Sequence, residues 1–208
     1  MGETVLKRMF DLTLSLLLLI GLLPLIVVIA ILIRIKLGPP IVFKQLRPGF
    51  NRTPFYIYKF RTMTNACDSE GNLLSDAERL TTFGALIRKT SLDELPQLIN
   101  VLKGEMSLVG PRPLLMRYLP FFSEREQRRF SVRPGITGLA QISGRNGLSW
   151  NERLELDAQY AENHSILLDI KILLISLTKV WKREGYYEVT NRQLPDLDVE
   201  RCSLLTSD

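Results

Sequence analysis

The sequence has few of the side chains on which many catalytic and metal sites depend. Its 208 residues include two cysteines, Cys67 and Cys202, and a single histidine, His164. The cysteines are too few and too isolated for a disulfide framework or a zinc site, so a reducing compartment is expected. His164 lies in a polar stretch that is typical of a loop or a helix cap. Serine–histidine, cysteine–histidine and multi-histidine metal chemistry are therefore disfavoured, and carboxylates and arginines must carry any reaction.

Net charge and chain length limit the possible partners and the number of domains only broadly. The 27 basic and 22 acidic side chains leave a net charge of +5, which suits an anionic membrane surface or phosphorylated substrates as readily as nucleic acid. A chain of 208 residues that is 46% apolar is long enough for one domain with a core and short for two. One folded domain is therefore expected.

One long apolar segment is present, from Leu12 to Ile33. Its 22 residues carry no charge, which meets the length criterion for a membrane helix. The run is too long for a cleavable signal peptide, and no small-residue cleavage site follows it. The segment is therefore predicted to lie in a membrane.

The ends and the middle of this segment favour a re-entrant topology. Lys7 and Arg8 precede it and Arg34 and Lys36 follow it, so the positive-inside rule gives no orientation. Pro24 lies near the middle, where it removes a helix hydrogen bond and clashes with the preceding turn. A helix-break-helix fits both features, with its two ends on the cytoplasmic side, its four cations at one headgroup layer, and Arg8 and Pro24 as the membrane anchor. A kinked spanning helix stays open as the alternative.

The remainder predicts an α+β fold that is mostly helical with a few short strands. Ile41–Phe43 and Phe55–Phe60 are predicted strands, and alternation places Lys59 and Arg61 on one face of the second. The spacing of Ser75-Asp76-Ala77-Glu78 is that of a capping box, which predicts a helix that continues towards residue 88.

A further helix is predicted to end at Gly104. Its apolar stripe consists of Leu95, Leu98, Ile99 and Leu102. Residues 133–147 hold four glycines and two arginines and are predicted to be a loop. The stretch Ile166–Trp181 is apolar but too short and too charged to span a membrane, so it belongs either to the core or to the membrane interface. A polar, mobile tail is predicted from Glu184 onward.

Two adjacent carboxylates, Asp93 and Glu94, precede the helix that ends at Gly104. The ordinary interpretation is structural: Ser91 and Glu94 have capping-box spacing, and an acidic first turn complements the helix dipole. The functional interpretation uses the same geometry, because neighbouring helical positions point about 100° apart. One carboxylate could then attack phosphorus while the other binds a metal. Pro96 predicts a local distortion at this pair.

Arginines next to proline occur three times. Arg112 stands between two prolines, and Arg47 and Arg133 each precede a Pro-Gly pair. Proline stiffens the backbone in advance, so less ordering entropy is lost when a guanidinium forks onto a phosphate. One such arginine is an ordinary turn, whereas three favour a phosphate-binding role. Further cations that fit this role are Lys59, Arg88 and Arg145.

Taken together, these motifs resemble the monotopic phosphoglycosyl transferases, the bacterial sugar transferase family, and most closely its small single-domain members. The resemblance runs from residue 7 to about residue 183. Its landmarks are FKQLRPG from Phe43, YKFRTM from Tyr58, SLDELPQ from Ser91, NVLKGEMS from Asn100, GPRP from Gly110 and RPGITG from Arg133. Each is short, but their joint order is highly specific.

The resemblance implies a ping-pong reaction. The carboxylate of Asp93 attacks the β-phosphate of a UDP-sugar, UMP leaves, and the sugar phosphate passes to polyprenyl (undecaprenyl) phosphate. Glu94 is implied to bind Mg²⁺, with Mn²⁺ as a substitute. The residues implied to contact phosphate or nucleotide are Lys59, Arg88, Arg112, Arg133 and Arg145. Such chemistry needs positioning and charge neutralisation more than acid–base groups, which agrees with the composition.

The resemblance also implies an organisation and a location. Residues 1–37 form a membrane-embedded re-entrant helix, residues 38–183 a cytoplasmic catalytic domain packed on the membrane, and residues 184–208 a polar tail. The expected place is the cytoplasmic face of the bacterial inner membrane, at the first membrane step of glycoconjugate or polysaccharide assembly. Phospholipid and downstream glycosyltransferases are the expected partners, and nucleic acid is not. One departure is that Leu23 precedes Pro24 where family members often have serine.

Two other functions compete with this interpretation. A membrane-tethered, non-enzymatic adaptor for acidic partners explains the apolar segment and the basic charge, but not the carboxylate pair beside proline-fixed arginines. A polytopic sugar-phosphate transferase conflicts with the single long apolar segment. The enzymatic interpretation accounts for all three features.

Overall fold

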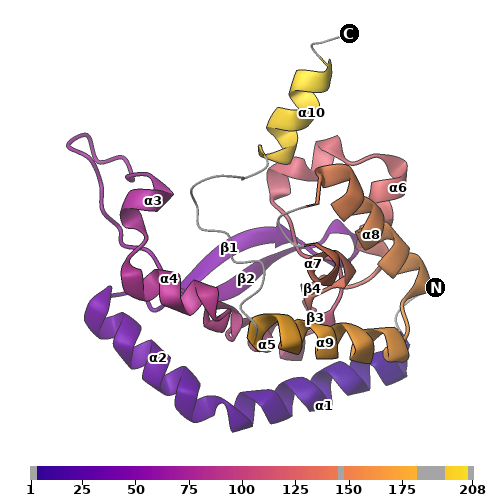
Figure 1. The fold of residues 1–208 in the computed structure, drawn as a ribbon, viewed down its shortest axis with the longest axis horizontal. Coiled ribbons are helices and arrows are strands. Elements are labelled where there is room, and N and C mark those ends of the chain that lie inside the picture. Colours follow the sequence, from indigo (N-terminus) through magenta and orange to yellow (C-terminus); the bar gives the residue numbers. More distant parts are fainter. Residues whose placement is uncertain (1–3, 145–147, 182–194, 206–208) are drawn as a thin grey trace.

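A bent pair of helices, α1 (Val5–Gly21) and α2 (Leu23–Lys36), runs along one edge of the molecule, and the other elements lie on its inner side (Figure 1). The computed structural model describes residues 4–144, 148–181 and 195–205. Among these residues no single helix is long and apolar enough to cross a membrane, whereas α1 and α2 meet that criterion only as a pair bent by 62°. The predicted helix-break-helix is therefore confirmed as a fold, and its position in a membrane stays a prediction.

The bend lies at Leu22, whose φ of −94° and ψ of 1° end the first helix. Pro24 falls in the first turn of α2, where its missing N–H would have had no partner within the helix. In a straight helix the proline ring would clash with the carbonyl of Ile20, four residues earlier. The break is thus the one predicted from Pro24, displaced by two residues towards the N-terminus.

The inner face of α1 is polar. Lys7, Asp11 and Ser15 are buried at intervals of four residues. The Lys7 Nζ pairs with Asp169 Oδ2 at 2.8 Å and with Asp11 Oδ1 at 3.3 Å, and it donates to Ser107 Oγ at 2.7 Å. Only 3% of the Lys7 side chain is exposed, so the prediction that it lies at a headgroup layer is wrong. The two carboxylates and the Ser107 hydroxyl compensate the ammonium for the water that it loses on burial.

Arg8 also contacts protein. Its guanidinium donates to the carbonyls of Leu102 (3.3 Å) and Met106 (3.5 Å), at the C-terminal end of α5 (Gln97–Lys103). The last carbonyls of a helix lack partners within it, and a cation there also complements the helix dipole. Arg8 therefore ties α1 to α5, and its role as a membrane anchor stays a prediction.

Exposed apolar side chains gather on α1, α2 and α9 (Ile166–Trp181). They are Val5, Leu6, Met9, Leu16, Leu17, Leu18 and Ile20 on α1, Leu23, Leu25, Val27, Val28, Ile31 and Ile35 on α2, and Leu167, Ile170, Leu174 and Leu177 on α9. The other side of α9 is in the core, because Asp169 and Ile172 are fully buried. The prediction that this helix belongs to the core is thus confirmed for one face, and contact of the other face with a membrane stays a prediction. An exposed apolar surface of this extent is typical of a site that binds a membrane or another protein.

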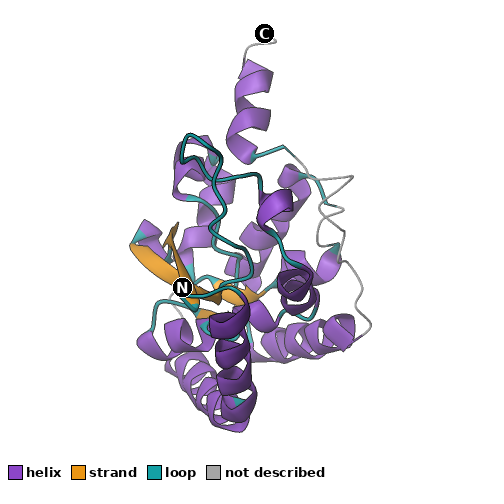
Figure 2. Cartoon of the chain, turned by 90° about the vertical axis from the view of Figure 1, so that its left-hand side faces the viewer, coloured by secondary structure: helices purple, strands orange, loops and turns teal. Residues whose placement is uncertain are grey.

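The strands form two small sheets between the α1–α2 pair and the helices farthest from it (Figure 2). β1 (Val42–Pro48) and β2 (Pro54–Phe60) make an antiparallel hairpin, longer than the first predicted strand. β3 (Ser107–Val109) and β4 (Gly135–Thr137) pair in parallel. The prediction of a loop over 133–147 is therefore wrong for residues 135–143, and residues 145–147 lie outside the described residues.

Close backbone approach explains this second sheet. A Cβ on Gly135 would lie 2.0 Å from the nitrogen of Gly110, so only glycine lets the two segments meet. After Gly138 the chain forms α7 (Leu139–Ser143). Gly135 and Gly138, two of the glycines that suggested a loop, are instead points of close contact with Gly110.

The predicted helix from Ser75 to residue 88 is interrupted. Its capping box is confirmed, but α3 (Asp76–Arg79) ends after one turn. Leu80 is extended and pairs with Met63 as an isolated bridge. A second helix, α4 (Thr82–Lys89), then begins with a cap of its own from Thr81. The single-helix prediction is wrong because a partner distant in sequence holds Leu80 in β geometry.

The remaining elements form a second layer. They are η1 (Phe50–Arg52), η3 (Met116–Phe121), α6 (Glu124–Gln127), η4 (Arg128–Ser131), α8 (Trp150–Asn163) and α10 (Leu197–Leu205). α10 lies on the side opposite to α1 and α2 (Figures 1 and 2). There Leu197 is fully buried and Trp150 Nε1 donates to the Pro195 carbonyl at 2.8 Å. The prediction of a mobile tail is wrong for residues 195–205, and residues 182–194 lie outside the described residues.

Removal of the Lys7 ammonium is expected to destabilise the fold strongly. Lys7→Ala leaves Asp11 and Asp169 as two buried carboxylates without their shared cation, and loss of one partner of a buried pair costs about 3–5 kcal/mol. The measurement is the free energy of unfolding in detergent, with Arg34→Ala as the control because Arg34 is exposed near the end of α2. The control should stay within about 0.5 kcal/mol of wild type. A loss below about 1 kcal/mol for Lys7→Ala would contradict this account of the α1 contact.

Candidate active site

The two adjacent carboxylates lie on a short 3₁₀ turn, η2 (Leu92–Glu94), just before α5. Ser91 enters this turn with φ 56° and ψ 17°, a left-handed conformation that is uncommon for a residue other than glycine. Its side chain makes no capping hydrogen bond, so the capping-box interpretation is wrong. The distortion predicted from Pro96 is confirmed, because the regular helix begins only at Gln97.

Glu94 is held between two cations. Its Oε1 lies 2.7 Å from Lys59 Nζ and 2.7 Å from Arg112 NH2. Burial alone would raise the pKa of Glu94, but Arg112 and then Lys59 outweigh it and lower the pKa to about 2. Glu94 is therefore an ionised carboxylate fixed in place by charge-assisted hydrogen bonds.

Asp93 is buried but more weakly paired. Its nearest cation is Lys59, whose Nζ lies 3.8 Å from Asp93 Oδ2, and only 8% of the residue is exposed. Burial raises the pKa of Asp93 to about 6, against the opposing effect of Lys59 and with some help from the charge of Glu94. Two neighbouring carboxyl groups whose pKa values are pushed apart are typical of sites where they have different tasks.

Lys59 reaches this pair because the end of β2 is clamped to α5. The side chain of Asn100 accepts a hydrogen bond from Tyr58 N at 3.0 Å and donates one to the Tyr56 carbonyl at 2.7 Å. Asn100 is fully buried, so this clamp fixes the strand residue that precedes Lys59. Sequence reasoning did not name Asn100 as a site residue. The available signal was an amide side chain with apolar neighbours on both sides, Ile99 and Val101.

Arg112 approaches Glu94 from the segment that follows β3. Pro111 and Pro113 are buried on either side of it, and the carbonyl of Pro111 accepts a hydrogen bond from Gly135 N at 3.0 Å. The Arg112 side chain itself is 45% exposed. A fixed backbone thus presents a guanidinium that touches Glu94 and remains open to solvent, as the two prolines predicted.

The other predicted cations differ in their placement. Arg88, at the end of α4, donates from Nε to Thr62 Oγ1 at 2.8 Å. Its positive charge opposes the rise in the pKa of Asp93 that burial causes. Arg133 lies elsewhere: its Nε donates to the Gly104 carbonyl at 2.8 Å and its guanidinium lies 5.7 Å from the centre of the Phe50 ring. Arg145 lies outside the described residues. The phosphate-binding roles of all three stay predictions.

Lys59 and Arg61, predicted on one strand face, have different partners. Lys59 contacts the carboxylate pair, whereas the Arg61 guanidinium donates to the carbonyls of Leu37, Gly38 and Pro39. Arg61 therefore secures the chain just after α2 and takes no part in the site.

Arg47 is a neighbour of Arg112 that sequence reasoning noted but did not assign to the site. Its NH2 donates to Gln45 Oε1 at 2.6 Å. Burial, and next the charge of Arg112, lower the pKa of Arg47 to about 10. The charges of Arg47 and Arg112 repel one another, so an anion bound close to both guanidinium groups would be favoured.

The described residues hold no group of three or more histidine, cysteine, aspartate or glutamate side chains that could enclose a metal ion. Asp93 and Glu94 nevertheless fit Mg²⁺ as part of a shared site, because this ion commonly takes one or two carboxylates and completes its shell with substrate phosphates and water. The two carboxylates supply hard oxygen donors of the kind that Mg²⁺ prefers.

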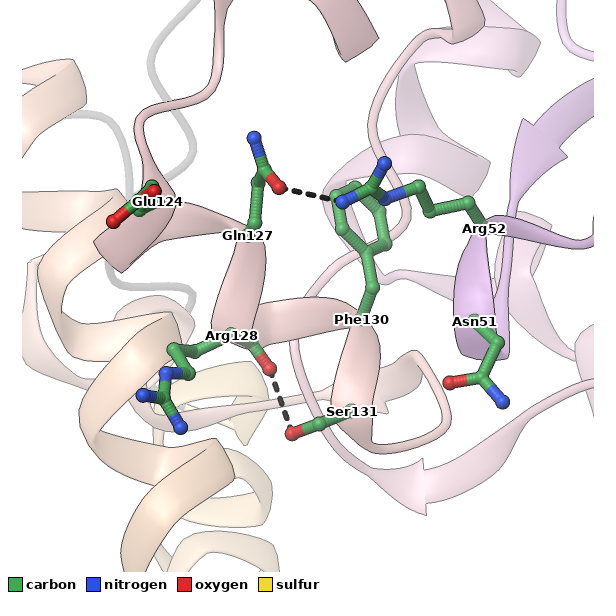
Figure 3. Close-up of a pocket in the computed structure, with 7 residues that line it drawn as sticks. All are labelled: Asn51, Arg52, Glu124, Gln127, Arg128, Phe130 and Ser131. Atoms are coloured by element: carbon green, nitrogen blue, oxygen red, sulfur yellow. Dashed lines mark hydrogen bonds between the residues drawn. The ribbon is translucent and has the colours of Figure 1, made fainter.

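A hollow in the described part of the chain lies apart from these residues. It has a volume of about 420 Å³ and is lined by Asn51, Arg52, Glu124, Gln127, Arg128, Phe130 and Ser131 (Figure 3). Arg52 donates to Gln127 across it, and Ser131 donates to the carbonyl of Arg128. None of the predicted site residues lines it, so the hollow does not identify the reactive centre.

Comparison with known proteins gives the same family as the motifs. Residues 2–183 match the family described as bacterial sugar transferase. The "Uncharacterized sugar transferase EpsL" of Bacillus subtilis is 54% identical over 187 residues, which cover 90% of this chain and 93% of that protein.

Two longer relatives carry more specific names. The "Undecaprenyl-phosphate glucose phosphotransferase" of Komagataeibacter xylinus is 42% identical over 86% of this chain and 37% of its own length. The "UDP-glucose:undecaprenyl-phosphate glucose-1-phosphate transferase" of Xanthomonas campestris is 35% identical over 87% of this chain and 40% of its own length. The family match, these relatives and the order of the motifs agree, and the chain belongs to the bacterial sugar transferase family.

Proposed function

We propose that this enzyme transfers a sugar 1-phosphate from a UDP-sugar to undecaprenyl phosphate and releases UMP. The names of the relatives from Komagataeibacter and Xanthomonas support this reaction class. The observation that carries the proposal is the asymmetry of the carboxylate pair. Asp93 is buried and weakly paired, while Glu94 is ionised and held by two cations.

In the first half-reaction the Asp93 carboxylate attacks the β-phosphorus of the UDP-sugar. A bond forms between an Asp93 oxygen and phosphorus as the bond from phosphorus to the UMP oxygen breaks, and UMP leaves as an anion. In the second half-reaction a phosphate oxygen of undecaprenyl phosphate attacks the same phosphorus and releases Asp93. Covalent catalysis of this kind divides one difficult transfer into two easier ones.

The cations around the pair fit this sequence. Lys59 lies near both carboxylates and Arg112 is partly open to solvent, so both are placed to neutralise phosphate charge as it approaches. Mg²⁺, or Mn²⁺ in its place, would be held by Glu94 and would neutralise part of the pyrophosphate charge. Arg88 and Arg145 are proposed as further phosphate or nucleotide contacts, and Arg133 in a less direct role.

A lipid acceptor requires contact with a membrane. The exposed apolar residues of α1, α2 and α9 support a re-entrant α1–α2 pair and an interfacial α9 at the cytoplasmic face of the bacterial inner membrane. Residues 38–183 would then form the catalytic domain on that surface. The product, a sugar linked to undecaprenyl by pyrophosphate, would be a substrate for glycosyltransferases that extend the glycan.

Asp93→Asn is expected to abolish turnover, because the neutral amide is a poor nucleophile at phosphorus. Incubation of wild type with a UDP-sugar alone should give a protein heavier by one sugar phosphate, measured by intact mass spectrometry. A panel of UDP-sugars identifies the donor. The rate of adduct formation should fall as the pH falls through about 6, because burial raises the pKa of Asp93 to about 6 and the neutral acid cannot attack.

A control variant accompanies this experiment. Asp76→Asn changes an aspartate on α3 that is 71% exposed and should leave the adduct and the turnover unchanged. An Asp93→Asn protein that still forms the adduct would refute the assignment of the nucleophile.

Activity is expected to require a divalent cation, because the pyrophosphate brings negative charge to a site that already holds two carboxylates. UMP release should stop in excess EDTA and return when Mg²⁺ exceeds the chelator. Glu94→Gln should raise the Mg²⁺ concentration needed for half the maximal rate by at least about 10-fold, since an amide is a weaker ligand. Full activity in excess EDTA would count decisively against this role of Glu94.

The re-entrant topology is tested by cysteine labelling at Thr4 and Lys36 in a background without Cys67 and Cys202. Both sites are expected to react with a membrane-impermeant reagent only from the cytoplasmic side. Pro24→Ala should shift the population towards a straight span, because it removes a proline cost of about 3 kcal/mol in a helix interior. Leu25→Ala is the matched control and should not change the labelling. Labelling of Thr4 and Lys36 from opposite sides in wild type would show that the pair spans.

A further inference from the structure

A second ion pair, fully buried, joins η4 to α8. Arg129 NH2 lies 3.0 Å from Asp157 Oδ2, and each side chain is only 2% exposed. Removal of two charges from water costs several kcal/mol, and their mutual attraction repays little more than that cost. A contribution to stability is therefore a weak explanation for the presence of this ion pair. The other contacts of Arg129 indicate a different role.

The same NH2 group of Arg129 also donates to the backbone carbonyl of Arg112. The guanidinium lies against two aromatic rings, 5.3 Å from the centre of Phe122 and 5.7 Å from the centre of Phe130. These rings and the Asp157 carboxylate fix the plane and the direction of the donor. Arg129 thus joins a rigid, buried cluster to the backbone of one residue of the active site.

Arg112 depends on its backbone for its position. Its side chain is 45% exposed and contacts Glu94 Oε1 at 2.7 Å, so little packing holds the guanidinium itself. The backbone is fixed on one side by the hydrogen bond from Gly135 N to the Pro111 carbonyl and on the other by Arg129. A shift of this carbonyl would move the guanidinium relative to Glu94.

We propose that Arg129, held by Asp157, is a positioning residue for the transfer reaction: it fixes the backbone of Arg112 so that the Arg112 guanidinium meets Glu94 and the substrate phosphates. The inference rests on the proposed function. Lysine could not replace Arg129, because a single ammonium on a flexible stem lacks the planar fork and the stacking face that reach all of these partners.

The test replaces the buried pair with apolar side chains, Arg129→Met with Asp157→Leu, so that no uncompensated charge remains in the core. The expected result is a 10- to 100-fold lower kcat/KM for the UDP-sugar, of the order seen when a catalytic group is misplaced by about 1 Å. The melting temperature should stay within a few degrees of wild type.

A double-mutant cycle with Arg112→Ala separates positioning from a general structural effect. In the Arg112→Ala background the apolar pair should change kcat/KM by less than about 2-fold, because the side chain that it positions is absent. The same loss in both backgrounds would overturn the proposal.

Arg125→Ala is the matched control. Arg125 also bridges to α8, through Glu155 at 2.9 Å and through Glu162, but its contacts are exposed and do not involve Arg112. Its loss should leave kcat/KM unchanged. An equal loss of activity in Arg125→Ala would show that the general contact with α8 matters and not the bond to Arg112.

Hydrogen exchange in the resting protein gives a readout that does not need turnover. The apolar pair should speed exchange at the amide of Gly135, which donates to the Pro111 carbonyl next to Arg112, and leave the amides of residues 97–103 unchanged. Unchanged exchange at Gly135 would overturn the inference even where the enzyme is active. Failure of the proposed function can be distinguished from failure of this inference. If the proposed function is wrong, wild type releases no UMP from any UDP-sugar, whereas the exchange measurement still tests the role of Arg129.

Discussion

The carboxylate of Glu94 is the contact on which the arrangement of the site depends. Its single oxygen Oε1 accepts from Lys59 at the end of β2 and from Arg112 after β3, and so it joins three segments that lie far apart in the sequence. Charge-assisted hydrogen bonds of about 2.7 Å are among the strongest polar contacts in proteins. With Glu94 held in this way, the neighbouring Asp93 is left with one distant cation. The difference between the two carboxyl groups follows from this arrangement.

The helix α5 is the support behind this contact. Asn100 clamps β2 to it, Arg8 binds its last carbonyls from α1, and Arg133 binds the Gly104 carbonyl that follows it. β2, α1 and the segment that carries Arg133 therefore all make contacts with one short helix. The position of the carboxylate pair, which immediately precedes α5, is thus coupled to the α1–α2 pair as well as to the rest of the domain.

The features that could be predicted from the sequence are those set by local rules. The break near Pro24 follows from the missing N–H and the ring of one proline, and the end of α5 follows from Gly104. The bounds of α9 follow from a stretch that is mostly apolar. The family itself was predictable from the order of short motifs. In each case the residues that decide the structure lie within a few positions of one another.

The features that could not be predicted depend on partners distant in sequence. Leu80 is extended because it meets Met63, and the glycines near Gly135 form a strand because Gly110 approaches them. Ser91 and Glu94 satisfy the spacing of a capping box, and only the positions of Lys59 and Arg112 decide against it. Asn100 and Arg129 carry no motif, so their clamps appear only once the fold is known.

The buried contacts of Lys7 have a consequence for the order in which the protein is made. α1 leaves the ribosome before α9, because Asp169, the ionic partner of Lys7, follows Lys7 by 162 residues. Until α9 has been synthesised, the Lys7 ammonium lacks the closer of its two carboxylate partners. The buried ion pair that joins α1 to α9 can therefore form only after most of the chain has been made.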